Sequence, residues 1–277
     1  MELDKSRLDV LEKIVQYEKE GKFDIDVEND PPSLELKPDQ VDYLQRKISS
    51  KIMRQIANYS GKKLIKSLIK NGMLVIKDIK GIENLKNLSG GAVLTCNHFG
   101  ANDSFLMQCV FEKVKHKRQR MYKVIREGNY TNPPGFSLLF RNCDVLPLSS
   151  NKTTMKNFIS AVDTLLSRGN YVLLYPEEAM WWNYRKPRPL KNGAYHFASK
   201  NKVPVVPIFV TMEDTDKIGP DGFAIQAYTI NILEPIYPDS SLHFKDNIEM
   251  IKNKNFTMWK DVYESFYNTK LVYTTKK

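Results

Sequence analysis

The chain has 277 residues, and its hydrophobic fraction of 42% is enough for a substantial core and excludes disorder of the whole chain. Its formal net charge of +10 favours an anionic partner, which is a nucleic acid, an acidic membrane surface or a phosphorylated substrate. The cysteines Cys96, Cys109 and Cys143 are scattered without a Cys-x-x-Cys spacing, so they predict neither a disulfide framework nor a zinc site and fit a reducing compartment.

Residues 1–38 are predicted to form an acidic N-terminal arm. Residues 1–36 hold eleven Asp and Glu against five Lys and Arg, with one short apolar ridge of helical spacing between Leu8 and Val15. Pro31 and Pro32 end any helix there. The first residues are acidic and lack the apolar core of a signal peptide. We predict no function for this arm.

Residues 39–73 are predicted to form a pair of basic amphipathic helices divided at Gly61. Lysines and arginines alternate with apolar residues spaced three or four apart, namely Val41, Leu44, Ile48, Ile52 and Ile56, then Leu64, Ile65, Leu68, Ile69 and Met73. Two interpretations stay open. Either these helices lie on an anionic membrane surface, or their apolar ridge packs on the following domain while the lysines face water.

Residues 74–277 predict an α/β domain with a mixed, largely parallel sheet flanked by helices. Short apolar runs predict strands at residues 74–79, 92–95, 122–125, 171–175, 203–210 and 224–233. Polar residues follow the runs at 92–95 and 171–175, as expected for a site at the carboxyl edge of an open sheet. The longest apolar stretches are far below the ~20 residues that span a bilayer, so any membrane contact should be peripheral.

Two basic segments allow two readings each. The run from Lys113 to Arg120 is either a solvated loop or a contact for a phosphate or a headgroup, and its lack of interleaved aromatic residues argues against a nucleic-acid platform. The loop with Trp181 and Trp182 and the cations after them either lines a substrate or membrane interface, or packs at least one indole in the ordinary way.

Asn97, His98 and Asp103 come just after the strand predicted at 92–95. His is the side chain whose unperturbed pKa lies nearest neutrality, and a carboxylate on its far nitrogen would fix the tautomer and stabilise the imidazolium. A helix that starts after Asp103 would add its positive end. The alternative is a loop histidine with a capping aspartate. Cys96 is either a small apolar residue or, less favoured, a thiol nucleophile.

These residues resemble the His-x4-Asp signature of the glycerolipid acyltransferase superfamily, the family of the 1-acylglycerol-3-phosphate O-acyltransferases. Three further pieces follow in the family's order over roughly residues 75–235. Residues 175–177 resemble the start of its Phe-Pro-Glu-Gly-Thr-Arg block, residues 191–193 its Lys-x-Gly, and residues 203–207 its Val-Pro-hydrophobic-hydrophobic-Pro block.

The resemblance implies a glycerol-3-phosphate acyltransferase-like fold and a role in phospholipid biosynthesis. The reaction would move a fatty acyl chain from the thioester of acyl-CoA or acyl carrier protein to a hydroxyl of a lysophospholipid-like acceptor, lysophosphatidate by default. His98 would be the base and Asp103 would orient it. The residues that the resemblance and their neighbourhood suggest for substrate binding are Asn97, Lys123, Glu177, Glu178, Arg141, Lys191 and Gly193.

The same resemblance requires no metal or redox cofactor, and a metal site of His98, Asp103 and Glu177 has no recognisable ligand spacing. The expected partners are the acyl donor, a lysolipid and an anionic membrane surface, with no nucleic acid. The expected location is cytoplasmic, peripheral to the inner face of the membrane. A thioester hydrolase and a non-enzymatic basic membrane- or nucleic-acid-binding protein remain as alternatives.

The chain departs from the family pattern at two places. Glu178, Ala179 and Met180 replace the family's Gly-Thr-Arg, which removes a glycine that lets backbone approach a ligand and an arginine suited to phosphate. In the family's second block, Ser149 or Ser150 replaces the terminal arginine. Cations that could substitute are Arg141, Lys152, Arg185, Lys186 and Arg188. A non-phosphate acceptor such as a glycolipid or a polyol is therefore an alternative.

Overall fold

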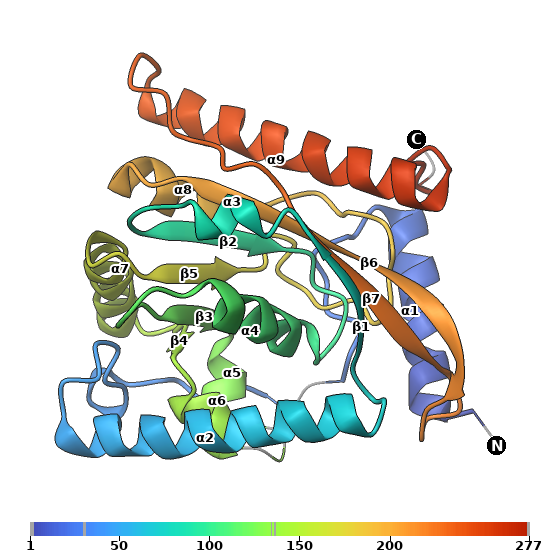
Figure 1. Cartoon of the computed structure of the whole chain (residues 1–277), viewed down its shortest axis with the longest axis horizontal. Helices are drawn as coiled ribbons and strands as arrows, with labels where there is room; N and C mark the ends of the chain where they lie inside the picture. Colours follow the sequence, from blue (N-terminus) through green and yellow to red (C-terminus); the bar gives the residue numbers. More distant parts are fainter. Residues whose placement is uncertain (1–2, 30–31, 134, 136, 276–277) are drawn as a thin grey trace.

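The computed structural model describes residues 3–29, 32–133, 135 and 137–275. Within these residues a seven-stranded sheet has the order β1-β7-β6-β2-β5-β3-β4 (Figure 1). The strands are β1 Val75–Lys80, β2 Ala92–Cys96, β3 Met121–Ile125, β4 Val145–Pro147, β5 Tyr171–Leu174, β6 Val205–Ile218 and β7 Ala224–Ile232. Neighbouring strands are parallel except for the antiparallel pair β6 and β7. The predicted mixed, largely parallel sheet is confirmed.

Helices cover both faces of this sheet (Figure 1). The core on one face includes side chains of α3 Glu83–Lys86 and α4 Asp103–Val114. The core on the other face includes side chains of α7 Lys152–Ser167, α8 Gly193–Asn201 and α9 Phe244–Tyr267. The remaining helices are α1 Lys5–Glu20, the 3-10 turn Pro38–Gln40, α2 Ile48–Lys70, α5 Glu127–Thr131 and α6 Ser137–Asn142.

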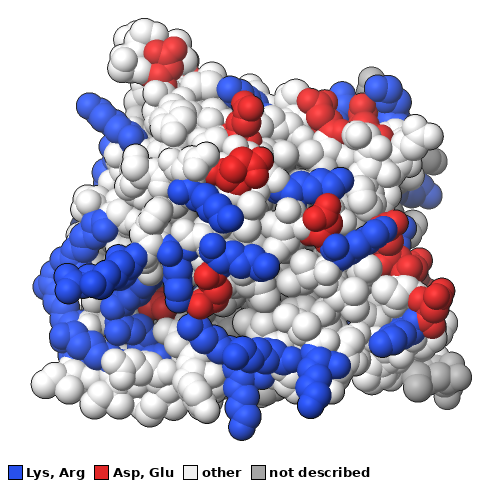
Figure 2. Space-filling model, viewed as in Figure 1, with Lys and Arg blue, Asp and Glu red and all other residues white. Residues whose placement is uncertain are grey.

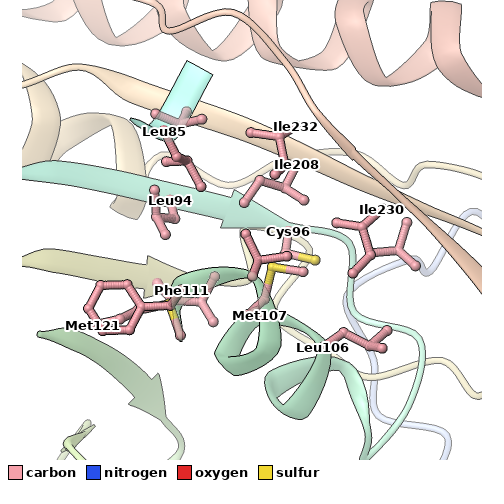
Figure 3. Packing of buried hydrophobic residues seen from close by; sticks show 14 of the residues in the cluster. Leu85, Leu94, Cys96, Leu106, Met107, Phe111, Met121, Ile208, Ile230 and Ile232 are labelled. Carbon is pink, nitrogen blue, oxygen red and sulfur yellow. The ribbon is translucent and has the colours of Figure 1, made fainter. Parts of the chain in front are cut away.

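The central strand β2 is buried on both faces, which explains its unbroken apolar run. Leu94 and Cys96 point to the α4 side, where they belong to the same buried cluster as Met107 and Phe111 (Figure 3). On the opposite side, the hydroxyl of Thr95 donates to Oδ1 of Asn255 in α9 at 2.6 Å. Because both faces are packed, β2 is held rigidly, and so is the start of the loop that follows it.

The basic segment forms one continuous helix, α2, where the sequence predicted two. Gly61 does not break it, because this glycine lies at the buried side of α2, where an added Cβ would lie 3.4 Å from Sγ of Cys143. The glycine thus lets α2 approach α6. On the other side of α2, Ile48, Ile52 and Ile56 are 76%, 53% and 46% exposed, so this first part of the ridge does not pack on the domain. In the second half of α2, Ile65 and Leu68 do pack against the core, as the other interpretation predicted.

The N-terminal arm folds back on the domain and covers the loop at residues 179–188. Val10 and Ile14 of α1 share a buried cluster with Ala179 and Trp181. The indole Nε1 of Trp181 donates to the carbonyl of Ile25 at 2.9 Å. The packing interpretation is confirmed for Trp181, which has no exposed surface. None of the helices in the described residues is long and apolar enough to cross a membrane.

Candidate active site

His98 and Asp103 form a close pair at the carboxyl end of β2. The strand ends at Cys96 and α4 begins at Asp103, so both side chains stand on a short strand-to-helix turn. Nδ1 of His98 lies 2.5 Å from Oδ2 of Asp103. The aspartate side chain is only 4% exposed, whereas the imidazole is 22% exposed. Within the described chain, Nε2 has no protein partner, so this nitrogen is open to a proton donor.

Tyr175, the last residue before the Pro-Glu block, contacts both members of this pair. Its hydroxyl donates to Oδ1 of Asp103 at 2.9 Å, and its ring stacks on His98 with 4.2 Å between centroids. Burial, together with the charge of Asp103, raises the pKa of Tyr175 well above its usual value, so the phenol stays a hydrogen-bond donor. The sequence analysis did not give Tyr175 a role. The sequence feature that could have pointed to this role is a tyrosine at the position where the family pattern has phenylalanine.

Glu177 lies behind the histidine and binds the protein itself. Its carboxylate accepts hydrogen bonds from the backbone N–H of His98 at 3.0 Å and from that of Arg188 at 2.8 Å. Nη2 of Arg188 lies 2.9 Å away, and both side chains are at most 2% exposed. The sequence analysis placed Glu177 among the residues that bind the substrate. The structure instead places it in a buried ion pair that fixes the backbone at His98.

The loop after Glu177 has an unusual backbone at Glu178. This residue has a φ of 65°, in the left-handed region that disfavours side chains other than glycine. Glu178 stands where the family pattern has glycine. The chain therefore has a left-handed backbone at this position, which suits glycine, although the residue is a glutamate. The side chain is exposed. Glu178 therefore adds negative charge to the surface beside the site.

Asn97 joins two strands rather than facing the turn. Its amide Nδ2 donates to the carbonyl of Val210 at 3.0 Å, and its Oδ1 accepts from the N–H of Val210 at 2.8 Å. The side chain therefore extends the pairing of β2 with β6. By contrast, within the described residues the N–H groups of Phe99 and Gly100 donate no hydrogen bond. These two N–H groups are candidate oxyanion donors, whereas the N–H of His98 is already bonded to Glu177.

The other substrate-binding candidates make contacts with residues other than His98. Lys123 pairs in β3 with Leu173 of β5, at the level of Leu94 in β2, and its Nζ donates to Oε1 of Gln108 at 2.9 Å. Burial lowers the pKa of Lys123, although the charge of Asp144 opposes this effect. Arg141 and Lys191 are held by hydrogen bonds and an ion pair with other parts of the chain.

Arg141 donates to the backbone carbonyls of Tyr130 and Thr131 and so holds the segment around α5. Lys191 pairs with Asp24 of the N-terminal arm at 2.6 Å, a hydrogen bond that raises the pKa of the lysine. Gly193 begins α8 with open space where a Cβ would stand.

The cations considered as substitutes for the missing arginines are mostly engaged. Arg188 is 1% exposed and also donates to the carbonyl of Phe23 at 2.9 Å. Arg185 pairs with Asp214 at 2.8 Å, and Lys186 pairs with Glu18 at 2.6 Å. Lys152, at the start of α7, is exposed.

Cys96 is a core residue and not a nucleophile. It has no exposed surface, and burial raises the pKa of its thiol well above the usual value, with the charges of Asp103 and Glu177 adding to the effect. A thiol in this environment stays protonated and inert. Among the described residues, no three His, Cys, Asp or Glu side chains are grouped so that they could hold a metal ion.

Fold and site together define an α/β domain with a histidine–aspartate pair at the carboxyl edge of its parallel strands. Residues 77–211 match the model of the family described as Acyltransferase. This segment belongs to that family, and it contains all four sequence pieces on which the resemblance was based. The family prediction is therefore confirmed, while the donor and the acceptor are not fixed by it.

The 1-acyl-sn-glycerophosphate (LPA) acyltransferase PlsC of Thermotoga maritima is similar over 78% of this chain and 84% of its own, with 17% identity and a TM-score of 0.47. The pilus retraction motor PilT with bound ADP is similar over 72% of this chain and 63% of its own, with 9% identity and a TM-score of 0.32. No curated protein sequence matches the chain.

Proposed function

We propose that this protein transfers a fatty acyl chain from the thioester of acyl-CoA or acyl carrier protein to a hydroxyl of a lysolipid acceptor. The observation that carries the proposal is the contact of Nδ1 of His98 with the buried carboxylate of Asp103, which leaves Nε2 open. Its position in the segment that matches the acyltransferase family supports this reaction class over other uses of a histidine.

In the proposed reaction, Nε2 of His98 takes the proton of the acceptor hydroxyl while that oxygen attacks the thioester carbon. Asp103 stabilises the imidazolium, and the N–H groups of Phe99 and Gly100 hold the oxyanion. The C–S bond then breaks, and the proton passes from His98 to the leaving thiolate. The buried thiol of Cys96 supports direct transfer between two bound substrates without an acyl-enzyme.

A non-phosphate acceptor is the second candidate, and one observation favours it. The arginine of the family's Pro-Glu block is missing. Arg188, a buried cation that follows this block in sequence, forms an ion pair with Glu177. A lysolipid with a polyol or sugar headgroup needs hydrogen bonds but no phosphate clamp. Lysophosphatidate stays the default that the family implies.

We also propose that α2 holds the protein on an anionic membrane surface from which the lipid acceptor is taken. Ile48, Ile52 and Ile56 are exposed in the first half of α2. At the helical period, the same face continues through Tyr59 into Lys63 and Lys66. Apolar side chains next to lysines on one helix face are typical of helices that lie in a membrane interface.

The test is an assay of the purified chain with isotope-labelled acyl-CoA, with acyl carrier protein as the alternative donor. Lysophosphatidate, a lysoglycolipid and a total lipid extract serve as acceptors, and mass spectrometry identifies the species that gains the label. His98→Ala should remove transfer, whereas His243→Ala should leave it intact, because His243 is exposed and its side chain makes no capping hydrogen bond to α9. Labelled free fatty acid without an acylated lipid, or transfer that survives in folded His98→Ala, contradicts the proposal.

A further inference from the structure

A basic cavity lies at the edge of the sheet opposite to His98. Its volume is about 300 Å³, which is at the lower end of the range for small-ligand pockets. Residues of the segment before β3, of the segment before β5 and of the start of α2 line the cavity. Since β2, β5 and β3 are parallel, Arg120 before β3 and His98 after β2 stand at opposite ends of the strands. The cavity is thus separate from the proposed active site.

Five cationic side chains line this cavity: Lys51, Arg54, Arg118, Arg120 and Arg168. None of the residues that line it in the described part of the chain is acidic. Figure 2 shows Lys and Arg side chains gathered at the lower left of the view, where Figure 1 places the start of α2 and, above it, α7. These cations come from three distant stretches of sequence, so folding, not local composition, brings them together.

The charges in this cavity are only weakly compensated. Nη1 of Arg54 and Nη1 of Arg120 donate to the same oxygen, Oε1 of Gln45, at 2.9 and 3.0 Å. One neutral oxygen therefore holds two like charges together, which costs Coulomb energy. Arg120 approaches a carboxylate only at 3.8 Å, at Oδ1 of Asp144.

The other three cations, Lys51, Arg118 and Arg168, have no acidic partner in the part of the chain that the structure describes. Tyr122 contributes a neutral group at the wall, and its hydroxyl accepts from Nη1 of Arg120 at 3.2 Å. The phenol proton is therefore available to a ligand. An anion in this cavity would relieve the repulsion and meet several donors at once.

We propose that this cavity binds a phosphomonoester dianion. Guanidinium groups match phosphate oxygens through paired hydrogen bonds, and arginine is the preferred residue for such sites. A dianion offsets more of this charge than a carboxylate does. The site goes beyond the proposed acyl transfer and does not depend on it. The phosphate belongs either to a free compound or to the headgroup of a lipid. The lipid source is considered because the exposed Ile48 and Ile52 lie beside Lys51 on α2.

The first experiment titrates the full chain with inorganic phosphate by calorimetry. The site variant is Lys51→Gln/Arg118→Gly/Arg168→Gln. Glycine suits position 118 because Arg118 has a φ of 68° there, so its replacement relieves the backbone. The control variant, Lys86→Gln/Lys156→Gln/Lys245→Gln, removes the same number of charges from exposed positions elsewhere. We expect at least about a tenfold loss of affinity in the site variant, since hydrogen bonds to charged groups are strong, and less than about a twofold loss in the control.

The second experiment distinguishes the two sources of the phosphate. Vesicles of phosphatidylcholine with phosphatidate are compared with vesicles that carry the same charge as phosphatidylglycerol, a phosphodiester. A preference for phosphatidate that the site variant alone loses assigns a lipid headgroup. Equal vesicle binding by both variants, with the phosphate titration still separating them, assigns a soluble ligand. The proposal is overturned if the wild-type chain shows no saturable phosphate binding, or if both variants lose affinity equally.

Discussion

The hydroxyl of Tyr175 donates to Asp103 at 2.9 Å while the ring of the same tyrosine stacks on His98. One side chain thus orients the carboxylate through a hydrogen bond and the imidazole through its face. The burial that raises the pKa of Tyr175 keeps its proton in place for this bond. Tyr175 is a positioning residue in this arrangement, because it acts on the proposed substrates only through the histidine–aspartate pair.

Tyr175→Phe should lower kcat by about tenfold, the scale of one hydrogen bond to a charged group, and leave KM nearly unchanged. Stacking on His98 is kept in this variant, so Tyr175→Leu should cost more. The measurement is a set of initial rates over donor concentration, with circular dichroism to confirm the fold. An unchanged kcat in Tyr175→Phe would show that the hydroxyl does not orient the pair.

Glu177→Gln should destabilise the fold by about 3–5 kcal/mol, because it leaves the guanidinium of Arg188 buried without its counter-charge. The free energy of unfolding in urea measures this loss. Glu178→Gln, at the exposed neighbouring position, is the matched control and should change stability by less than about 0.5 kcal/mol. If Glu177 bound the acceptor instead, Glu177→Gln would raise KM and leave the unfolding free energy near that of the wild type.

Glu178→Gly should stabilise the protein by up to about 1 kcal/mol. The left-handed backbone at φ 65° costs a residue with a side chain about 1–2 kcal/mol, and the greater entropy of glycine in the unfolded chain offsets part of the gain. Glu178→Ala keeps the strained backbone and should give no such gain. Urea unfolding of the two variants, side by side, decides the matter, and equal stability would contradict the role given to the backbone.

Glu18→Gln should lower the melting temperature at neutral pH but not in acid. Burial alone would raise the pKa of Glu18, but hydrogen bonds from Lys186, the N–H of Thr274 and Tyr184 together lower it. A carboxyl whose pKa is lower in the folded state stabilises the fold above its usual pKa, near 4.5, and loses this effect as the pH falls through the folded value.

Melting curves of the wild type and Glu18→Gln between neutral pH and about pH 3 test this linkage. The expected difference corresponds to about 1–3 kcal/mol at pH 7 and vanishes in acid. Glu12→Gln, at an exposed position of the same helix, should match the wild type throughout. A gap between Glu18→Gln and the wild type that stays constant with pH would argue against the linkage.

Ile52→Ser/Ile56→Ser should weaken binding to anionic vesicles by at least about tenfold, because each isoleucine loses apolar burial in the interface. The folded chain should keep its stability, since both side chains are about half exposed. Ile218→Ser/Val272→Ser removes two apolar side chains elsewhere that are 55% and 66% exposed, and it is the matched control. Vesicle sedimentation that gives the same bound fraction for both double variants would refute the role of α2.

Six of the seven strands could be predicted because each has an apolar run in the sequence, whereas the three-residue edge strand β4 was missed. The apolar runs at 92–95 and 171–175 became β2 and β5, which pair side by side. The His98–Asp103 pair was predictable for a related reason. The two residues are five positions apart on the short turn between a strand end and a helix start, which leaves few ways to separate their side chains.

Other parts of the site depend on long-range contacts that no local pattern encodes. Glu177 was expected to bind the substrate because its carboxylate follows a strand and the sequence shows no partner for it. In the structure it pairs in the interior with Arg188, eleven residues later. The amide of Asn97 meets Val210 across the sheet. The sequence also could not show whether the apolar ridge of α2 is exposed or packed, because helical periodicity identifies an apolar face but not what covers it.

The carboxylate of Glu18 accepts from the backbone N–H of Thr274, and its backbone carbonyl accepts from the hydroxyl of Thr275, so the first helix and the last described residues meet at Glu18. A fragment cut to residues 77–211 would lose this clasp, together with the carbonyls of Phe23 and Ile25 that hold Arg188 and Trp181. The family-matched stretch is therefore not a module that can be excised, because residues outside it hold the loop that fixes the backbone at His98.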